Sequence, residues 1–153
     1  MTALATEGLT AEQMVKIARE QVDAFNNSDW ERLQAGLSAD ASYKEFATQR
    51  KVEGPEKIVE IFKGWKTAFP DATGTVTSAV GSGSIAALEV TWKGTHTGPL
   101  QAGEGTIPAS GKHQETPGAY FFTFEGGKIK ESRQYFDSMT LLKQVGAQPK
   151  RDG

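Results

Sequence analysis

The stretch KHQETPGAYFFTFEGGKIKESRQYFD, residues 112–137, contains two period-two segments separated by the glycine pair at 126–127. This pattern predicts two β-strands joined by a tight turn. Two more alternating runs precede them, at residues 73–80 and 85–96, with a glycine–serine turn at 81–84 between them. Four successive strands with short connections predict a mainly antiparallel sheet in the second half of the chain.

Three amphipathic helices are expected before this sheet, because apolar residues recur there at helical spacing. Thr10 with Gln13, and Ser28 with Glu31, have the spacing of capping boxes, and Pro55 suits the first position of the third helix. The expected elements are helices at 10–25, 28–37 and 54–69, a short strand at 39–46, and a last helix at 138–145. Helices first and strands last predict an α+β fold, in which a curved sheet closes on a pocket beneath the helices.

The charge balance and composition exclude several classes of protein. The 153 residues include 17 basic and 19 acidic side chains and no cysteine, so the basic footprint of a nucleic-acid-binding protein is missing. No run approaches the roughly 20 apolar residues of a membrane span, and the first residues lack the pattern of a signal peptide. We expect a cytoplasmic protein without nucleic-acid or membrane partners. Its expected parts are a flexible tail at 1–9, one domain at 10–147 and a second tail at 148–153.

The last strand carries the first candidate for chemistry. Strict alternation places Arg133, Tyr135 and Asp137 on one face together with Ile129 and Glu131. If that face is the concave one, Asp137 lies in an apolar pocket, where burial would raise its pKa and suit it to general acid/base catalysis, whereas a nearby arginine such as Arg133 would lower that pKa. Two structural interpretations stay open, a solvated face with a cross-strand ion pair and an Asp137 that caps the following helix.

The strand at 85–96 supplies further candidates. Trp92 and His96 fall on its core-like face, where a histidine is either structural or a proton donor at the mouth of a pocket. The histidines show no metal-ligand spacing, and we expect no metal. The letters GSGSIA at 81–86 match a dinucleotide-binding pattern, but a strand rather than a helix follows, so we interpret them as a turn.

Residues 119–124 are apolar on both faces of their strand, with Phe121 on one face and Tyr120 and Phe122 on the other. A strand buried on both sides implies that the outer face of the sheet is also covered. The helices can cover only one face, so we expect a homodimer through the outer sheet face.

Several short motifs resemble those of one known family in order and spacing. They are AFPD at 68–71, GTHTGP at 94–99, IPASGK at 107–112, GKI at 127–129 with Glu131 and Asp137, and LLKQVG at 141–146. Together they resemble the SnoaL-like polyketide cyclase, or ester cyclase, branch of the nuclear-transport-factor-two-like superfamily. The resemblance extends over about residues 10–147.

The resemblance implies a cone-shaped sheet around helices, a cystatin-like α+β barrel with a mostly apolar pocket, often dimeric. It implies a cyclase or isomerase that acts on a hydrophobic carbonyl compound without metal or cofactor. The catalytic residues would be Asp137 and His96, and the substrate-binding residues would be Tyr43, Trp92, Phe121, Arg133 and Tyr135. Many relatives carry tryptophan at the position of Arg133, so the charge of this pocket would differ from theirs.

Two alternatives remain. Some members of the superfamily pair aspartate with arginine to activate water, so Arg133 is compatible with an epoxide or ester hydrolase. That reaction needs a second carboxylate near Arg133, for which Glu45 and Glu131 are the candidates. The other alternative is a dimeric ligand-binding module without catalysis.

Overall fold

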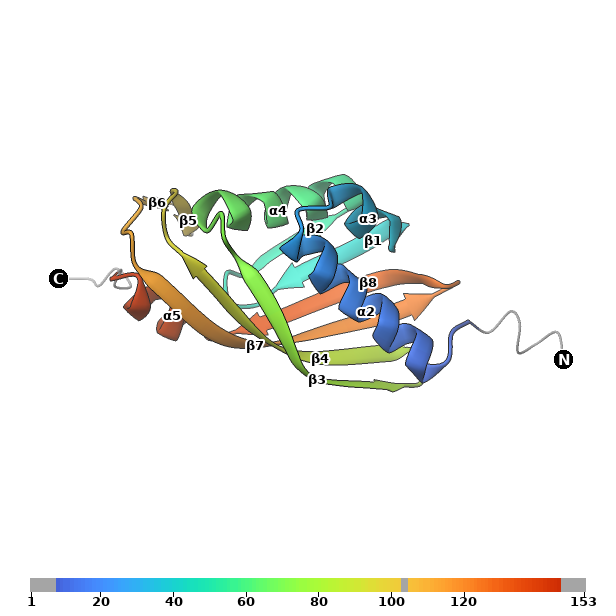
Figure 1. The fold of residues 1–153 in the computed structure, drawn as a ribbon. Coiled ribbons are helices and arrows are strands. Elements are labelled where there is room, and N and C mark those ends of the chain that lie inside the picture. Colours follow the sequence, from blue (N-terminus) through green and yellow to red (C-terminus); the bar gives the residue numbers. More distant parts are fainter. Residues whose placement is uncertain (1–7, 103–104, 147–153) are drawn as a thin grey trace, which may run out of the picture.

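A six-stranded sheet curves around two helices and forms most of the protein (Figure 1). The structure is a computed structural model that describes residues 8–102 and 105–146. The predicted tails at 1–9 and 148–153 therefore lie almost entirely outside the described residues. The elements are α2 Ala11–Asn26, α3 Trp30–Ala35, β1 Leu37–Glu45, β2 Arg50–Glu53, α4 Pro55–Ala68, β3 Thr73–Ser82, β4 Ile85–Thr95, β5 Leu100–Ala102, β6 Gly105–Ile107, β7 His113–Glu125, β8 Lys128–Phe136 and α5 Ser138–Gln144.

The predicted helices are confirmed, and their ends follow local chemistry. At the start of α2, Thr10 and Gln13 form the expected capping box, and Pro55 occupies the first turn of α4. The cap of α3 differs from the prediction, because Asp29 rather than Ser28 accepts the hydrogen bond from the backbone N–H of Arg32. Ser28 has a φ of 53°, so the chain turns there before the helix begins.

The sheet has the strand order β2-β1-β8-β7-β4-β3. The strand pairs β3–β4, β4–β7 and β7–β8 are antiparallel as predicted, whereas β1 pairs with β8 in parallel. The mainly antiparallel α+β fold is thus confirmed. The short strand β2 and the separate β5–β6 pair are additions that the sequence pattern did not reveal.

The register of β8 corrects one prediction. Thr123 pairs with Glu131, but the next residue of β7, Phe124, pairs with Ile129, so Lys130 is an extra residue in β8. Such a bulge exchanges the two faces of a strand. Ile129 is therefore buried before the bulge. After it Ser132 and Gln134 point inward, while Glu131, Arg133 and Tyr135 lie on the outer face.

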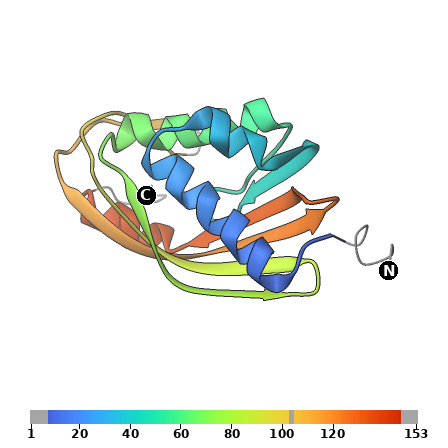
Figure 2. The ribbon, with the colours of Figure 1, turned by 45° about the vertical axis from the view of Figure 1, so that its right-hand side comes forward.

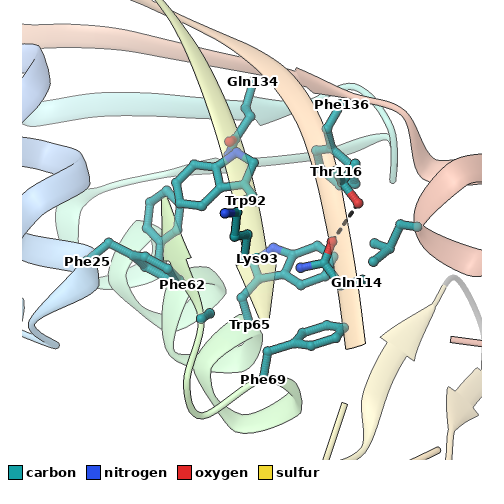
Figure 3. Close-up of a pocket in the computed structure, with 12 residues that line it drawn as sticks. Phe25, Phe62, Trp65, Phe69, Trp92, Lys93, Gln114, Thr116, Gln134 and Phe136 are labelled. Atoms are coloured by element: carbon teal, nitrogen blue, oxygen red, sulfur yellow. Dashed lines mark hydrogen bonds between the residues drawn. The ribbon is translucent and has the colours of Figure 1, made fainter. Parts of the chain in front are cut away.

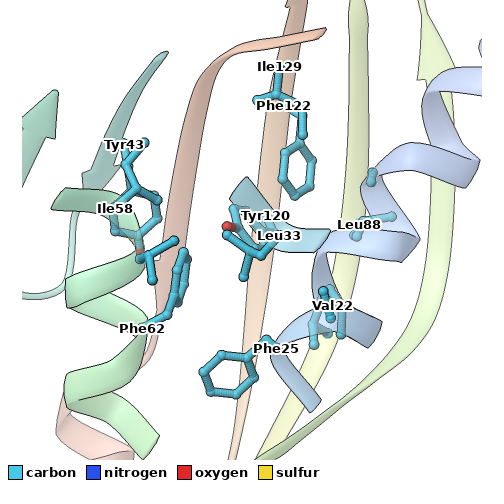
Figure 4. Close-up of a cluster of buried hydrophobic side chains, with 14 of the residues drawn as sticks. Val22, Phe25, Leu33, Tyr43, Ile58, Phe62, Leu88, Tyr120, Phe122 and Ile129 are labelled. Atoms are coloured by element: carbon cyan, nitrogen blue, oxygen red, sulfur yellow. The ribbon is translucent and has the colours of Figure 1, made fainter. Parts of the chain in front are cut away.

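Helices α2 and α4 cover the concave face of the sheet, and the core lies between them and the strands (Figures 1 and 2). Large side chains from both layers meet there, among them Phe25, Phe62, Tyr43 and Phe122, each at most 4% exposed (Figure 4). Burying each of these contributes about 1.5–3 kcal/mol. The described helices are all too short or too polar to cross a lipid bilayer.

Candidate functional site

An aromatic cavity opens at one end of the concave face, between α4, the β4–β7–β8 strands and α5 (Figure 3). The cavity volume is about 60 Å³, within about 510 Å³ of non-atom space that includes open solvent at the mouth. Six aromatic rings form most of the wall, and four polar side chains interrupt it. The lining consists of Phe25, Phe62, Trp65, Phe69, Ala72, Trp92, Lys93, Gln114, Thr116, Gln134, Phe136 and Leu141.

Trp92 owes its position to a glycine on the neighbouring strand. A Cβ at Gly74 would lie 2.6 Å from the indole ring, so only glycine leaves room for Trp92 there. The Asn26 side chain exchanges two hydrogen bonds with the backbone of Gly74, at 2.7 and 2.9 Å, and ties β3 to the end of α2. Phe25 packs edge-on against Trp92 with centroids 5.4 Å apart. The indole is therefore held on this wall from two sides.

Gln114 and Thr116 form the polar part of the β7 wall. Thr116 Oγ1 donates to Gln114 Oε1 at 2.5 Å, and both residues are buried. This bond orients the Gln114 amide, so its nitrogen is the group left to donate to a ligand. Gln144 of α5 exchanges hydrogen bonds of 2.8 and 3.0 Å with the backbone of Glu115. These bonds hold α5 against β7 beside the cavity.

A buried carboxylate lies directly behind the aromatic wall. Glu45 is 0% exposed, and its Oε2 accepts from the Tyr43 hydroxyl at 2.6 Å and from the Trp65 indole N–H at 2.9 Å. Its Oε1 accepts from Arg50 Nη2 and Thr48 Oγ1, at 2.7 and 2.6 Å. Burial and the charge of Glu45 raise the pKa of Tyr43 well above its usual range, so that phenol stays protonated. A carboxylate can be buried in this way because hydrogen-bond donors and a positive charge satisfy both of its oxygens.

The wall of the cavity itself is almost uncharged. Lys93 is the ionisable member of the lining, and its half-exposed side chain lies 3.7 Å from Glu115 Oε1. Trp92, Gln114, Thr116 and Gln134 supply neutral hydrogen-bonding groups instead. Such a lining suits an apolar ligand with a few polar atoms. In the described ranges, three or more acidic or histidine side chains do not gather as metal ligands would.

The structure separates the predicted substrate-binding residues. Trp92 lines the cavity, whereas Tyr43 is fully buried behind the wall and holds Gln134 instead of facing a ligand. Phe121, Arg133 and Tyr135 lie on the outer face, so their predicted inward direction is wrong. For Arg133 and Tyr135 the cause is the bulge at Lys130. Phe121 keeps the alternation of β7, and its neighbours at 120 and 122 are the buried ones.

Asp137 caps a helix and does not line the cavity. Its oxygens accept from the backbone N–H and the hydroxyl of Thr140, at 3.0 and 2.6 Å, at the start of α5. The hydroxyl and backbone hydrogen bonds of Thr140 lower the pKa of the exposed Asp137 carboxyl. The expectation of a desolvated carboxyl with a raised pKa is therefore wrong, and the position fits the capping alternative. A catalytic role for Asp137 stays a prediction.

His96 is fully buried next to Phe69, whose ring centroid lies 5.3 Å from that of the imidazole. The backbone N–H of Ser110 donates to Nδ1 at 3.2 Å, which places the single proton of the neutral ring on Nε2. Nε2 has no hydrogen-bond partner within the described part of the chain. His96 is absent from the cavity lining, so its position agrees with the structural interpretation.

Burial lowers the pKa of His96 below its ordinary value of 6.5. At mildly acidic pH the His96 imidazole is therefore protonated in the unfolded chain but still neutral in the folded chain. The free energy of unfolding consequently falls as the pH drops below about 6.5. We expect the free energy of unfolding, measured by urea titration at several pH values, to decrease between pH 7 and pH 5. His96→Asn, whose Oδ1 replaces Nδ1 as acceptor for Ser110, should remove that decrease. Carboxyls such as Asp71 and Asp137, whose pKa is lowered, lose their contribution to stability only below about pH 4, so they do not cause a decrease between pH 7 and pH 5. If stability decreased equally in the variant over this range, His96 would not be the cause.

Much of the lining was missed at the sequence level, although a signal for part of it was present. Gln114 and Thr116 continue the same period-two face as Tyr120 and Phe122, so extending that alternation backward along β7 would have placed them inward. The alternation of β1 likewise places Glu45 on the same buried face as Ala41 and Tyr43, but the partners that neutralise its carboxylate come from three different elements and have no mark in the sequence.

Comparison with known proteins gives a family and a set of similar folds. The family model described as SnoaL-like polyketide cyclase matches residues 16–145. No curated protein sequence matches the chain.

Three solved structures illustrate the similarity of fold. A SnoaL-like polyketide cyclase described as putative, from Jannaschia sp. CCS1, is 18% identical with a TM-score of 0.80 and covers 91% of this chain and 95% of its own. IdmH from Streptomyces antibioticus, described as a putative polyketide cyclase, is 24% identical with a TM-score of 0.72, covering 86% and 97%. An epoxide hydrolase from M. tuberculosis is 15% identical with a TM-score of 0.68, covering 88% and 90%. Because one fold carries differently named activities, it does not select a reaction.

Proposed function

Because this chain belongs to the SnoaL-like polyketide cyclase family, we propose that it binds a hydrophobic carbonyl compound in the aromatic cavity and promotes its ring closure or isomerisation. The observation that supports this is the lining, in which six aromatic rings surround a few neutral polar groups. Aromatic walls bury the apolar body of a ligand, and the polar groups fix its orientation. The proposal needs no cofactor, because ring closure and isomerisation transfer protons and form a carbon–carbon bond or shift a double bond, without net oxidation or reduction.

Ring closure begins when a carbon next to a carbonyl loses a proton and its carbonyl oxygen becomes negatively charged. The electron pair then attacks a second carbonyl carbon, and the oxygen of that carbonyl takes up a proton. The donors on the wall are the Gln114 amide N–H and the indole N–H of Trp92. They suit the developing oxyanion, while a folded substrate brings the two reacting carbons together.

The reaction also needs a group that accepts the proton. By resemblance Asp137 would take the proton, and its sequence neighbour Phe136 lines the cavity. Its lowered pKa, however, makes it a weak base. We therefore propose that hydroxide from the solvent takes the proton at the mouth and that the water so formed returns a proton to the second carbonyl oxygen. Positioning and oxyanion stabilisation then supply most of the rate.

Exchange of the α-hydrogens of 2-tetralone in D₂O, followed by NMR, tests this function. We expect the protein to accelerate the exchange above the buffer rate, and Asp137→Asn, which keeps the helix cap, to retain at least a third of the acceleration. A rate in the variant equal to that of buffer would identify Asp137 as the base. Binding of 2-tetralone without any acceleration would contradict catalysis and leave the ligand-binding alternative.

The hydrolase alternative does not fit the observed positions. Arg133 pairs with Glu131 on the outer face, and Glu45 is fully buried in a pair with Arg50. No arginine lines the cavity within the described residues. We therefore do not propose water activation by an Asp–Arg pair.

We further propose that the protein is a cytoplasmic homodimer that associates through the outer face of the sheet. Phe46 and Tyr135 stack there at 4.2 Å, and Phe121 meets Tyr135 edge-on at 5.9 Å. Lys44 and Arg133 lie over Phe46 and Phe121, at 4.4 and 5.6 Å. Such an aromatic cluster, with Tyr135 at 39% exposure, is typical of an interface core. The lack of cysteine is compatible with a reducing compartment.

Tyr135→Asp should convert the dimer into a monomer, because the two-fold interface would lose two stacked rings and have to desolvate two carboxylates in their place. Light scattering after size-exclusion chromatography measures the change. Val80→Asp, at a 60% exposed position in β3, is the control and should leave the dimer intact. A wild-type protein that is monomeric at tens of micromolar, or a Tyr135→Asp protein that is still dimeric, would overturn this interface.

A further inference from the structure

Behind the cavity wall, the donor and the acceptor of each hydrogen bond can be assigned, starting from Glu45. Arg50 donates two N–H groups to its Oε1, at 2.7 and 3.1 Å, and Trp65 donates one to Oε2. Neither arginine nor indole can accept a hydrogen bond. Glu45 is therefore the acceptor in every one of these contacts.

The contacts of Glu45 also decide which hydrogen bond the Tyr43 hydroxyl donates and which it accepts. Its hydroxyl lies 2.6 Å from Glu45 Oε2 and 2.8 Å from Gln134 Nε2. A phenol has one proton, and the carboxylate takes it. The Tyr43 oxygen is thus left with lone pairs only, and it must accept from its second neighbour.

Gln134 supplies that donor, which fixes its amide. If the amide were turned over, its oxygen would face the lone pairs of Tyr43 at hydrogen-bond distance, so only the orientation with Nε2 toward Tyr43 is favourable. Its oxygen then points away from Tyr43. Oε1 accepts no hydrogen bond from the described part of the chain, and the buried unpartnered atoms there are limited to Nε2 of His96. Oε1 of Gln134 therefore reaches the cavity, which this side chain lines (Figure 3).

We infer that Glu45 acts as a positioning residue which, through Tyr43, turns Gln134 into a fixed hydrogen-bond acceptor at the inner wall of the cavity. This inference deepens the proposed function and rests on it, because it names a chemical feature of the ligand. The compound should carry a hydroxyl group, phenolic or enolic, at the end that meets Gln134. An ether or a carbonyl at that position would place its lone pairs against Oε1 and leave both oxygens without a donor.

Two probes that share one ring system test the inference, 2-naphthol and 2-methoxynaphthalene, each titrated into the protein by isothermal calorimetry. We expect 2-naphthol to bind about tenfold more tightly, the effect of one hydrogen bond. Gln134→Met, which keeps the length of the side chain, and Tyr43→Phe, which frees the amide to turn, should each bring the ratio of the two affinities below about threefold. Circular dichroism establishes that both variants are folded.

The ratio separates a positioning role from a structural one, because general loosening of the cavity would weaken both probes alike. Equal affinities in the wild type, or tighter binding of the methoxy compound, would overturn the inference and leave the proposed function intact. A preference that persists in Tyr43→Phe would overturn the relay from Glu45. If neither probe binds to any of the three proteins, both the inference and the ligand cavity are contradicted.

Discussion

Replacing Glu45 by alanine is expected to lower the free energy of unfolding by about 3 kcal/mol. The change leaves Tyr43 and Trp65 with unpaired polar groups in the interior, and it leaves the Arg50 charge without its partner. Removing one member of a buried ion pair typically costs 3–5 kcal/mol, and the 34% exposure of the Arg50 side chain places this case at the lower end. Chemical denaturation followed by tryptophan fluorescence measures the loss.

A matched control distinguishes this pair from ion pairs at the surface. Asp40 pairs with Lys130 on the exposed side of the molecule, and its side chain is 71% exposed. Asp40→Ala should have only a small effect, because exposed ion pairs contribute little. If Glu45→Ala were as mild as Asp40→Ala, the network would not support the cavity wall, and the positioning role of Glu45 would fall with it.

Thr116→Phe is expected to weaken the binding of 2-tetralone by at least tenfold and to abolish the accelerated exchange. Thr116 lies on the inner face of β7 in the cavity lining, so a ring at this position occupies the space that the ligand needs. Calorimetry gives the affinity, and thermal unfolding shows whether the variant keeps its fold, since overpacking costs about 1–3 kcal/mol.

Thr123→Phe is the control, because it makes the same change on the outer face of the same strand. It should bind 2-tetralone as the wild type does. Loss of binding in the Thr123 variant together with full binding in the Thr116 variant would place the ligand site outside the cavity.

The fold could be predicted because its determinants are local. Capping residues, the proline at the start of α4 and period-two alternation in β4 and β7 each act over a few residues, and they agree with one another. The strand β2 was missed because it is four residues long and owes its pairing to β1.

The candidate site was harder to predict, because one residue reversed a whole strand. Lys130 has no mark in the sequence that distinguishes it from a regular strand residue, yet the bulge there turns Arg133 and Tyr135 outward and Gln134 inward. Trp92 was placed correctly because β4 keeps its alternation. Asp137 lies where the strand gives way to α5, so its role as a cap overrides the alternation.

The most direct test of the ligand cavity is a ¹H–¹⁵N NMR titration of the labelled protein with 2-tetralone. We expect the largest shift changes at the indole N–H of Trp92 and at the side-chain amides of Gln114 and Gln134, with little change at the backbone of Thr123 and Arg133 on the outer face. Changes confined to the outer face, or no change at millimolar ligand, would contradict the cavity as the site where this protein acts.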